Sequence, residues 1–174
     1  MKQLKLLKVF ALLIVAITFS SCFGWGFEDD GLPPDEYYYS DYEPQILNRS
    51  EIDDSIQILE NQSMVQSSKI YVIGDYIFIN DKYRGFHIFD NSDPSNPIKK
   101  KFLNFPGATD IAIRDNTLFV NQATDLVALS FDFDAFTFTI KKRVENVFPE
   151  LYSPDGYYEY VNSDEIIVNW IEKN

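Results

Sequence analysis

Apolar residues in the second half of the chain fall into short runs separated by turn-forming residues such as Gly, Asp, Asn and Pro. Runs of about four to eight residues that are rich in β-branched and aromatic side chains and bounded in this way are typical of β-strands. We predict strands at 69–73, 76–80, 85–90, 98–104, 109–114, 117–121, 126–131 and 137–145. The pattern therefore favours an all-β fold.

The predicted strands form two copies of one unit, 69–107 and 108–149. The aligned segments are Ile70–Asn80 with Ile111–Asn121, Gly85–Asp90 with Asp125–Ser130, and Ile98–Phe102 with Ile140–Val144. A four-stranded antiparallel unit that repeats about every 40 residues is typical of a β-propeller blade.

Turn residues and apolar runs refine this prediction. Gly74-Asp75 and Asp115-Asn116 separate the first two strands of each unit, and they suit two-residue primed turns because these residues tolerate a positive φ. The apolar runs are nearly continuous rather than alternating, which predicts sheets that are covered on both faces. Lysines in the fourth strand of each unit indicate a solvent-exposed edge.

Two units cannot close a propeller, which needs about four to eight blades. A further apolar run at 165–171 predicts one more strand. Either the chain is the front part of a longer propeller, or the two units pack face to face as a small sandwich with this strand added. Both alternatives place residues 65–174 in one β-repeat domain of tandem propeller-like blades.

Residues 49–64 are predicted to form a short helical lead-in to this domain. Ser50 can cap a helix, and Ile52, Ile56 and Leu59 recur at the spacing of one helical face. This is the one helix that the pattern predicts downstream of the first 48 residues.

The first unit resembles the bacterial LVIVD repeat over Gly74–Ile79, Gly85–Asp90 and Ser92–Pro97. Its hallmark positions are Gly74, Asp75, Gly85, Asp90, Asp93, Pro94 and Pro97. The resemblance covers about residues 65–150, and the second unit departs from it where Ser130–Phe136 replaces the Asp-Pro turn. Proteins with this repeat are mostly exported, propeller-like lipoproteins with no assigned reaction, and the resemblance implies the same here.

Residues 1–21 have the organisation of a lipoprotein signal peptide. Lys2, Lys5 and Lys8 precede the apolar run Phe10–Phe19, and two serines precede the single cysteine, Cys22. The run is too short to cross a bilayer comfortably, which favours export and cleavage. We therefore predict lipidation of Cys22. A diacylglyceryl thioether and an amide-linked acyl chain there would exceed the roughly two acyl chains that stable anchoring requires. The alternatives are cleavage at another bond and an ordinary buried thiol.

Residues 22–48 are predicted to be an acidic, flexible tether. The segment carries seven acidic residues, no Lys or Arg, and three prolines, a composition that opposes a packed core. Acidic residues soon after a lipidated cysteine resemble the surface-export signals of some lipoproteins, and a plain solvated linker is the alternative. Tyrosines at 37–39 and 42 either stack on sugars or a partner, or contact the domain.

Charge and cysteine content narrow the function classes. Removal of residues 1–21 takes away three lysines and no acid, which lowers the net charge from −12 to −15. A protein with this much negative charge repels nucleic-acid phosphates and anionic lipid headgroups. We therefore expect it to contact the membrane through the lipid on Cys22 alone. With one cysteine, an intramolecular disulfide is impossible.

The sequence contains few residues suited to catalysis. His87 is the sole histidine and lies in an apolar strand, so we predict a structural role for it. Asp132 and Asp134 alternate and suit a weak Ca²⁺ site, although a hairpin explains them as well. We therefore expect no catalytic residues, no metal and no cofactor.

These observations favour a non-catalytic β-repeat protein that is lipid-anchored in the cell envelope, at the periplasmic or outer face of an outer membrane. Its expected ligand is an envelope protein or a glycan. The alternative is an accessory carbohydrate-active or other hydrolytic protein with carboxylates on its loops, for which Asp90, Asp93 and the Asp53-Asp54 pair are the candidates.

Overall fold

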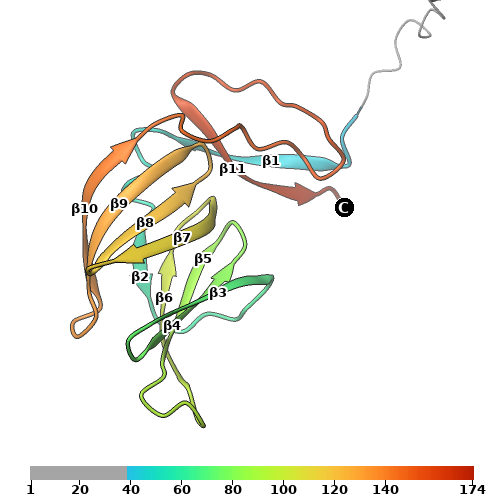
Figure 1. The fold of residues 1–174 in the computed structure, drawn as a ribbon. Helices are drawn as coiled ribbons and strands as arrows, with labels where there is room; N and C mark the ends of the chain where they lie inside the picture. The colour runs from blue at the N-terminus through green and yellow to red at the C-terminus, as the bar shows by residue number, and fades with distance from the viewer. Residues whose placement is uncertain (1–38) are drawn as a thin grey trace, which may run out of the picture. The chain divides into compact units, whose positions relative to one another are not determined.

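The computed structural model describes residues 39–174, which form eleven strands in three antiparallel sheets and no helix (Figure 1). The strands are β1 (Tyr42–Asn48), β2 (Gln57–Leu59), β3 (Ser67–Ile73), β4 (Tyr76–Asp81), β5 (Gly85–Asp90), β6 (Ile98–Asn104), β7 (Ala108–Arg114), β8 (Thr117–Gln122), β9 (Asp125–Asp132), β10 (Thr137–Val144) and β11 (Glu165–Glu172). The prediction of an all-β fold is confirmed.

Each predicted repeat unit is a four-stranded meander. Sheet 1 has the strand order β2-β6-β5-β4-β3, and sheet 2 has the order β10-β9-β8-β7. All eight predicted strands are present, and their ends differ from the prediction by no more than two residues. The units do not close into a propeller. The fourth strands carry equivalent bulges at Lys100 and Lys141, so the predicted alignment of Ile98 with Ile140 was one residue out.

Primed turn geometry explains the first hairpin of each unit. Asp115 and Asn116 both have positive φ angles, of 48° and 59°, as a type I′ turn requires. In sheet 1, Gly74 has a φ of 52° at the equivalent turn. These turns fix the register that pairs Ile73 with Tyr76 and Arg114 with Thr117.

The two sheets pack against each other through one face each. The resulting core includes Phe78, Phe86, Ile88 and Leu103 from sheet 1, and Leu118, Val120, Val127, Leu129 and Phe131 from sheet 2. These side chains are all excluded from solvent, or nearly so. The two units therefore pack face to face, and burial of this apolar surface is the main source of the domain's stability.

The expectation that both faces of each sheet are covered was wrong. Leu118 and Val120 are buried, whereas Phe119 between them is 37% exposed. On β3, Ile70 and Val72 are each 64% exposed. A two-sheet stack covers only one face per sheet, so the outer faces stay in contact with solvent despite their apolar residues.

The predicted helix over 49–64 is absent, which corrects the sequence analysis. Residues 49–55 form a succession of turns, and β2 follows and pairs with β6. The amide of Ser55 donates to the carbonyl of Glu51 at 3.1 Å, which is a single helical turn that does not continue. Ile52 and Ile56 are buried as their spacing suggested, but two buried positions fit a pair of turns equally well.

The predicted strand at 165–171 is confirmed as β11, and its partner is β1. The predicted tether extended to residue 48, so the structure corrects its last seven residues, which form β1. Tyr42 pairs with Glu172 and Asn48 with Glu165. Ile166 and Val168 of β11 form a second small core with Ile52. This two-stranded ribbon joins segments from opposite ends of the described chain (Figure 1).

Candidate functional site

A buried charge cluster fastens the ribbon to sheet 2. The Arg49 guanidinium, at the end of β1, lies 3.1 Å from a carboxylate oxygen of Asp125, which is fully buried. Arg143 of β10 reaches the same carboxylate at 2.9 Å. Burial alone would raise the pKa of Asp125, but the Asn146 amide and the Arg49 charge outweigh burial and lower it. Asp125 is therefore ionised at neutral pH.

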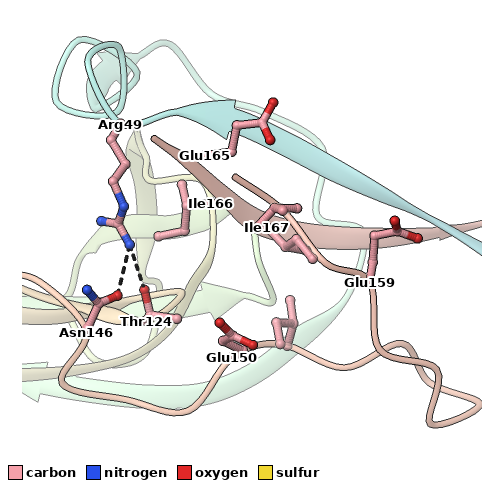
Figure 2. A pocket seen from close by; sticks show the side chains of 10 residues that line it. Arg49, Thr124, Asn146, Glu150, Glu159, Glu165, Ile166 and Ile167 are labelled. Carbon is pink, nitrogen blue, oxygen red and sulfur yellow. Dashed lines mark hydrogen bonds between the residues drawn. The ribbon is translucent and has the colours of Figure 1, made fainter. Parts of the chain in front are cut away.

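A pocket lies beside this cluster (Figure 2). It is lined by Arg49, Thr124, Asn146, Glu150, Leu151, Glu159, Val161, Glu165, Ile166 and Ile167. Its volume of about 40 Å³ admits only a few waters. Arg49 donates to Thr124 and Asn146, as Figure 2 shows, and its guanidinium is thus already engaged. We interpret the cluster as a structural clamp.

A larger groove of about 420 Å³ lies where four segments meet. The ribbon provides Tyr42, Asn169 and Trp170, and the β4–β5 hairpin provides Lys82 and Tyr83. The loop before β11 provides Tyr152 and Pro154, and the residue just before β3 is Gln66. We call these eight residues the aromatic groove. It combines aromatic rings with two amides and one ammonium group, and it contains no carboxylate.

Backbone contacts hold Tyr83 at one side of the groove. Its φ is 61°, which is unusual for a non-glycine residue. Its amide donates to the Ala108 carbonyl at 2.9 Å, and its carbonyl accepts from the Gly107 amide at 2.8 Å. The Lys82 ammonium lies 4.8 Å from the centre of the Tyr83 ring. Tyr83 is therefore fixed to the start of sheet 2 rather than free to collapse on its own hairpin.

The opposite side of the groove is fixed by Trp170. Its indole N–H donates to the Leu151 carbonyl at 2.9 Å, and its ring meets Tyr157 edge to face, with 6.3 Å between centroids. Asp155 anchors the same loop by accepting from Ser40 at 3.0 Å and from the Asp41 amide at 2.8 Å. Its hydrogen bonds, with Ser153 the strongest influence, lower the pKa of Asp155 to about 2.

This arrangement suits a neutral, hydroxyl-rich ligand. Aromatic faces contact the C–H faces of a sugar ring, while amide and ammonium groups hydrogen-bond to its hydroxyls. Concave sites with apolar walls and a few polar groups are the usual binding sites of small ligands. Its eight lining residues include no Asp, Glu, His, Cys, Ser or Thr.

Four hallmark residues of the first repeat, Asp90, Asp93, Pro94 and Pro97, lie at the end of β5 and in the loop to β6, which contributes no residue to the groove. The Asp90 carboxylate accepts from the Ser92 amide and Asp93 accepts from the Ser95 amide, each at 3.0 Å, in the loop that also holds Pro94 and Pro97. The bond from Ser92, with Lys100 nearby, lowers the pKa of Asp90 to about 2. These carboxylates close the loop on its backbone amides.

Gly85 and the Gly74-Asp75 turn have backbone roles. A Cβ at Gly85 would lie 2.1 Å from the Leu103 carbonyl oxygen, and its φ is 140°. Only glycine fits there, because β6 passes too closely for any side chain. The Asp75 carbonyl accepts from the Asn91 amide at 2.6 Å, which ties the first turn to the Asp-Pro loop.

The remaining sequence candidates have structural surroundings. His87 is fully buried beside Asp81. Asp132 accepts from the amides of Asp134 and Ala135 at 2.9 Å, as in a hairpin turn. Asp53 pairs with Arg143. Within residues 39–174, no cluster of three or more acidic, His or Cys side chains is arranged to hold a metal.

Cys22 lies outside the described residues. Within residues 39–174, no helix is long and apolar enough to cross a membrane.

Sequence reasoning did not find the aromatic groove. It did note the tyrosines at 37–39 and 42. Lys82, Tyr83 and Trp170 carried no signal, because their meeting depends on the pairing of β1 with β11. A cluster of aromatic residues near both ends of the domain was the only available indication.

Comparison with known proteins supports the repeat. The profile of the LVIVD repeat family matches residues 66–104, which correspond to β3 through β6. No curated protein and no solved structure matches the chain.

Proposed function

We propose that the protein is a non-catalytic, lipid-anchored β-repeat protein of the cell envelope that binds a glycan in the aromatic groove. The observation that carries the proposal is the convergence of Tyr83, Tyr152 and Trp170 with the groove's amide and ammonium groups. The lipoprotein-like leader and Cys22 support the location.

The composition of the groove favours a neutral glycan over an anionic or protein ligand. Its one charged group is Lys82, in a chain with a net charge of −12. A polyanion would be repelled by the rest of the surface. A groove of about 420 Å³ accommodates a short oligosaccharide segment, whereas a stable protein interface needs roughly 1,200 Å² or more of total buried area.

Binding is tested by affinity electrophoresis through gels that contain one neutral polysaccharide each, such as xylan, mannan or β-glucan. Tyr152 is 55% exposed and lines the groove, while Tyr160 is 80% exposed in the same loop and does not line it. We expect Tyr152→Ala to weaken retardation about tenfold, because one stacking ring contributes about 1 kcal/mol or slightly more. Tyr160→Ala is the matched control and should bind as the wild type does.

Absence of retardation in every polysaccharide, or equal losses in both variants, would contradict the glycan proposal. Release of reducing ends by the wild-type protein would instead favour the hydrolytic alternative.

The anchor is tested separately. We expect Cys22→Ser to abolish incorporation of radiolabelled palmitate and to release the protein from membranes, since the acyl chains on Cys22 are the proposed anchor. Persistent labelling of this variant would overturn the lipoprotein proposal while leaving the glycan site untouched.

A further inference from the structure

The two sheets have equivalent faces that can be matched residue by residue. The front face of sheet 1 carries Ile70, Val72, Ile77, Ile79 and Phe89, and the front face of sheet 2 carries the equivalent Ile111, Ile113, Leu118, Val120 and Leu129. The back faces carry Tyr71, Phe78, Asn80, Phe86 and Ile88 in sheet 1, and Ala112, Phe119, Asn121, Leu126 and Ala128 in sheet 2.

Inside the chain, the back face of sheet 1 packs on the front face of sheet 2. Phe78, Phe86 and Ile88 are fully buried against Leu118, Val120 and Leu129. The junction is therefore head to tail: it joins two different faces of the same repeated unit. Such a junction leaves two faces without a partner sheet: the front face of sheet 1 and the back face of sheet 2. We call these the left-over faces.

Those two left-over faces remain apolar and, within residues 39–174, are only partly covered. On the front face of sheet 1, Ile70 and Val72 project to solvent. On the back face of sheet 2, Phe119, Asn121 and Leu126 line a depression of about 360 Å³. Arg84 and the segment 60–66 cover only the other end of the sheet 1 face, over Phe102.

A pair of equivalent asparagines lies at the internal junction and on the left-over back face. Asn80 of sheet 1 donates its side-chain Nδ2 to the Ala108 carbonyl of sheet 2 at 3.3 Å, which bridges the internal junction, and its Oδ1 accepts from Ser68 within sheet 1. Its equivalent, Asn121, has a buried Oδ1 with no hydrogen-bond partner among the described residues. A buried polar atom of this kind usually has a partner.

Charge is complementary at the left-over faces as well. Across the internal junction, Lys69 of β3 pairs with Asp110 of β7, and these two residues are equivalent positions in the two units. If another copy adds its sheet 1 to the back of sheet 2, its Lys69 meets Asp110 again. Opposite charges therefore recur at each junction.

We propose that a second copy of this chain packs its sheet 1 front face, at Ile70 and Val72, on the sheet 2 back face, at Phe119 and Asn121. The contact repeats the internal junction between chains. Because it joins unlike faces, it closes into a ring or extends as a filament. Rings of about two to four copies would contain the four to eight blades of a propeller.

The test is co-purification of full-length chains that carry two different affinity tags and are expressed together. We expect wild-type chains to retain each other. Val72→Glu blocks the front face and Phe119→Glu blocks the back face, so chains that all carry one of these changes should lose retention by about tenfold or more. Tyr160→Glu, far from either face in sequence and already exposed, is the control and should be retained.

The decisive arm mixes the two variants. A Val72→Glu chain keeps an intact back face on sheet 2, and a Phe119→Glu chain keeps an intact front face on sheet 1. These two faces can form one junction, so the two variants should co-purify when they are mixed. Ile70→Glu and Ala112→Glu repeat the test at neighbouring exposed positions, and unchanged thermal unfolding shows that each variant folds. Lack of wild-type retention, or failure of the mixture to co-purify, would overturn the proposal.

Discussion

Asp81 and His87 form a fully buried pair in sheet 1, with 3.2 Å between Oδ2 and Nε2. Asp81 also accepts from the amides of Val65 and Gln66 and from Arg84, so it ties the segment before β3 to the β4–β5 hairpin. His87 Nδ1 has no hydrogen-bond partner among the described residues, and its ring lies 4.7 Å from that of Phe102. Asp81 thus organises this end of the sheet, and His87 completes it in its neutral form.

The first prediction concerns pH. Burial lowers the pKa of His87 below its ordinary value of 6.5, with Lys99 and Arg84 acting in the same direction, and Asp81 opposes the shift only in part. As the pH falls below 6.5, His87 is therefore protonated more readily in the unfolded chain than in the folded chain. Stability should be complete above about pH 6.5 and fall as the pH drops through the folded pKa.

The measurement is the thermal unfolding midpoint at pH 7.5 and pH 5.5. His87 is the only histidine, so His87→Gln, which keeps a hydrogen-bonding group beside Asp81, should flatten the profile in this range. An equal decline in both proteins would show that another group controls it. The pKa of Asp81 is also lowered, although burial alone would raise it, so its own contribution should be lost only below about pH 4.

The second prediction concerns Gly85. Gly85→Ala places a Cβ 2.1 Å from the Leu103 carbonyl oxygen and 2.8 Å from the Phe105 amide nitrogen, at a φ that L-residues rarely adopt. We expect a loss of more than about 3 kcal/mol in the free energy of unfolding, since β6 must move away. Gly74→Ala, with φ 52° and no atom within 4 Å of its Cβ, should cost only about 1 kcal/mol. Similar urea midpoints for the two variants would contradict this account.

The third prediction concerns the clamp around Asp125. Asp125→Ala leaves Arg49 and Arg143 without their shared buried carboxylate, and we expect a loss of about 3–5 kcal/mol in unfolding free energy. Asp53 pairs with the same Arg143, but its side chain is 52% exposed, so Asp53→Ala should cost less than about 1 kcal/mol. Chemical denaturation measures both, and comparable losses would show that burial is not the source of the effect.

The strands of both sheets could be predicted because local signals define them. Asp115 and Asn116 dictate their own turn, and the apolar residues on either side of that turn need no distant partner to be recognised. Gly85 was found as a hallmark of the repeat, but its steric reason lies in the close passage of β6, which only the structure shows.

β1, β2 and the exposed faces could not be predicted, each for a physical reason. β1 contains Pro44, which sequence rules associate with breaks, and its partner β11 lies more than a hundred residues away. β2 has only three residues, and the spacing of Ile52 and Ile56 imitates a helix. The solvent exposure of Ile70 and Phe119 depends on how many sheets stack on each other. The local sequence pattern does not contain this information.

The fourth prediction concerns the ribbon. Ile166, Ile167, Val168 and Trp170 are all buried in β11, and the strand pairs with β1 along its whole length. Deletion of residues 165–174 should therefore lower the free energy of unfolding by more than about 2 kcal/mol, as expected when several apolar side chains lose their cover. It should also release the β1 amides, because β11 is their only pairing partner among the described strands.

Hydrogen exchange separates this local effect from general unfolding. In the intact protein, amides through Ile166–Ile171 should be protected together with those of β1. After the deletion, β1 should exchange rapidly while β8 and β9, in the main core, keep their protection. Rapid exchange of β11 in the intact protein would mean that the ribbon is not a stable part of the domain, and that the groove it shares with Tyr83 and Tyr152 lacks one of its walls.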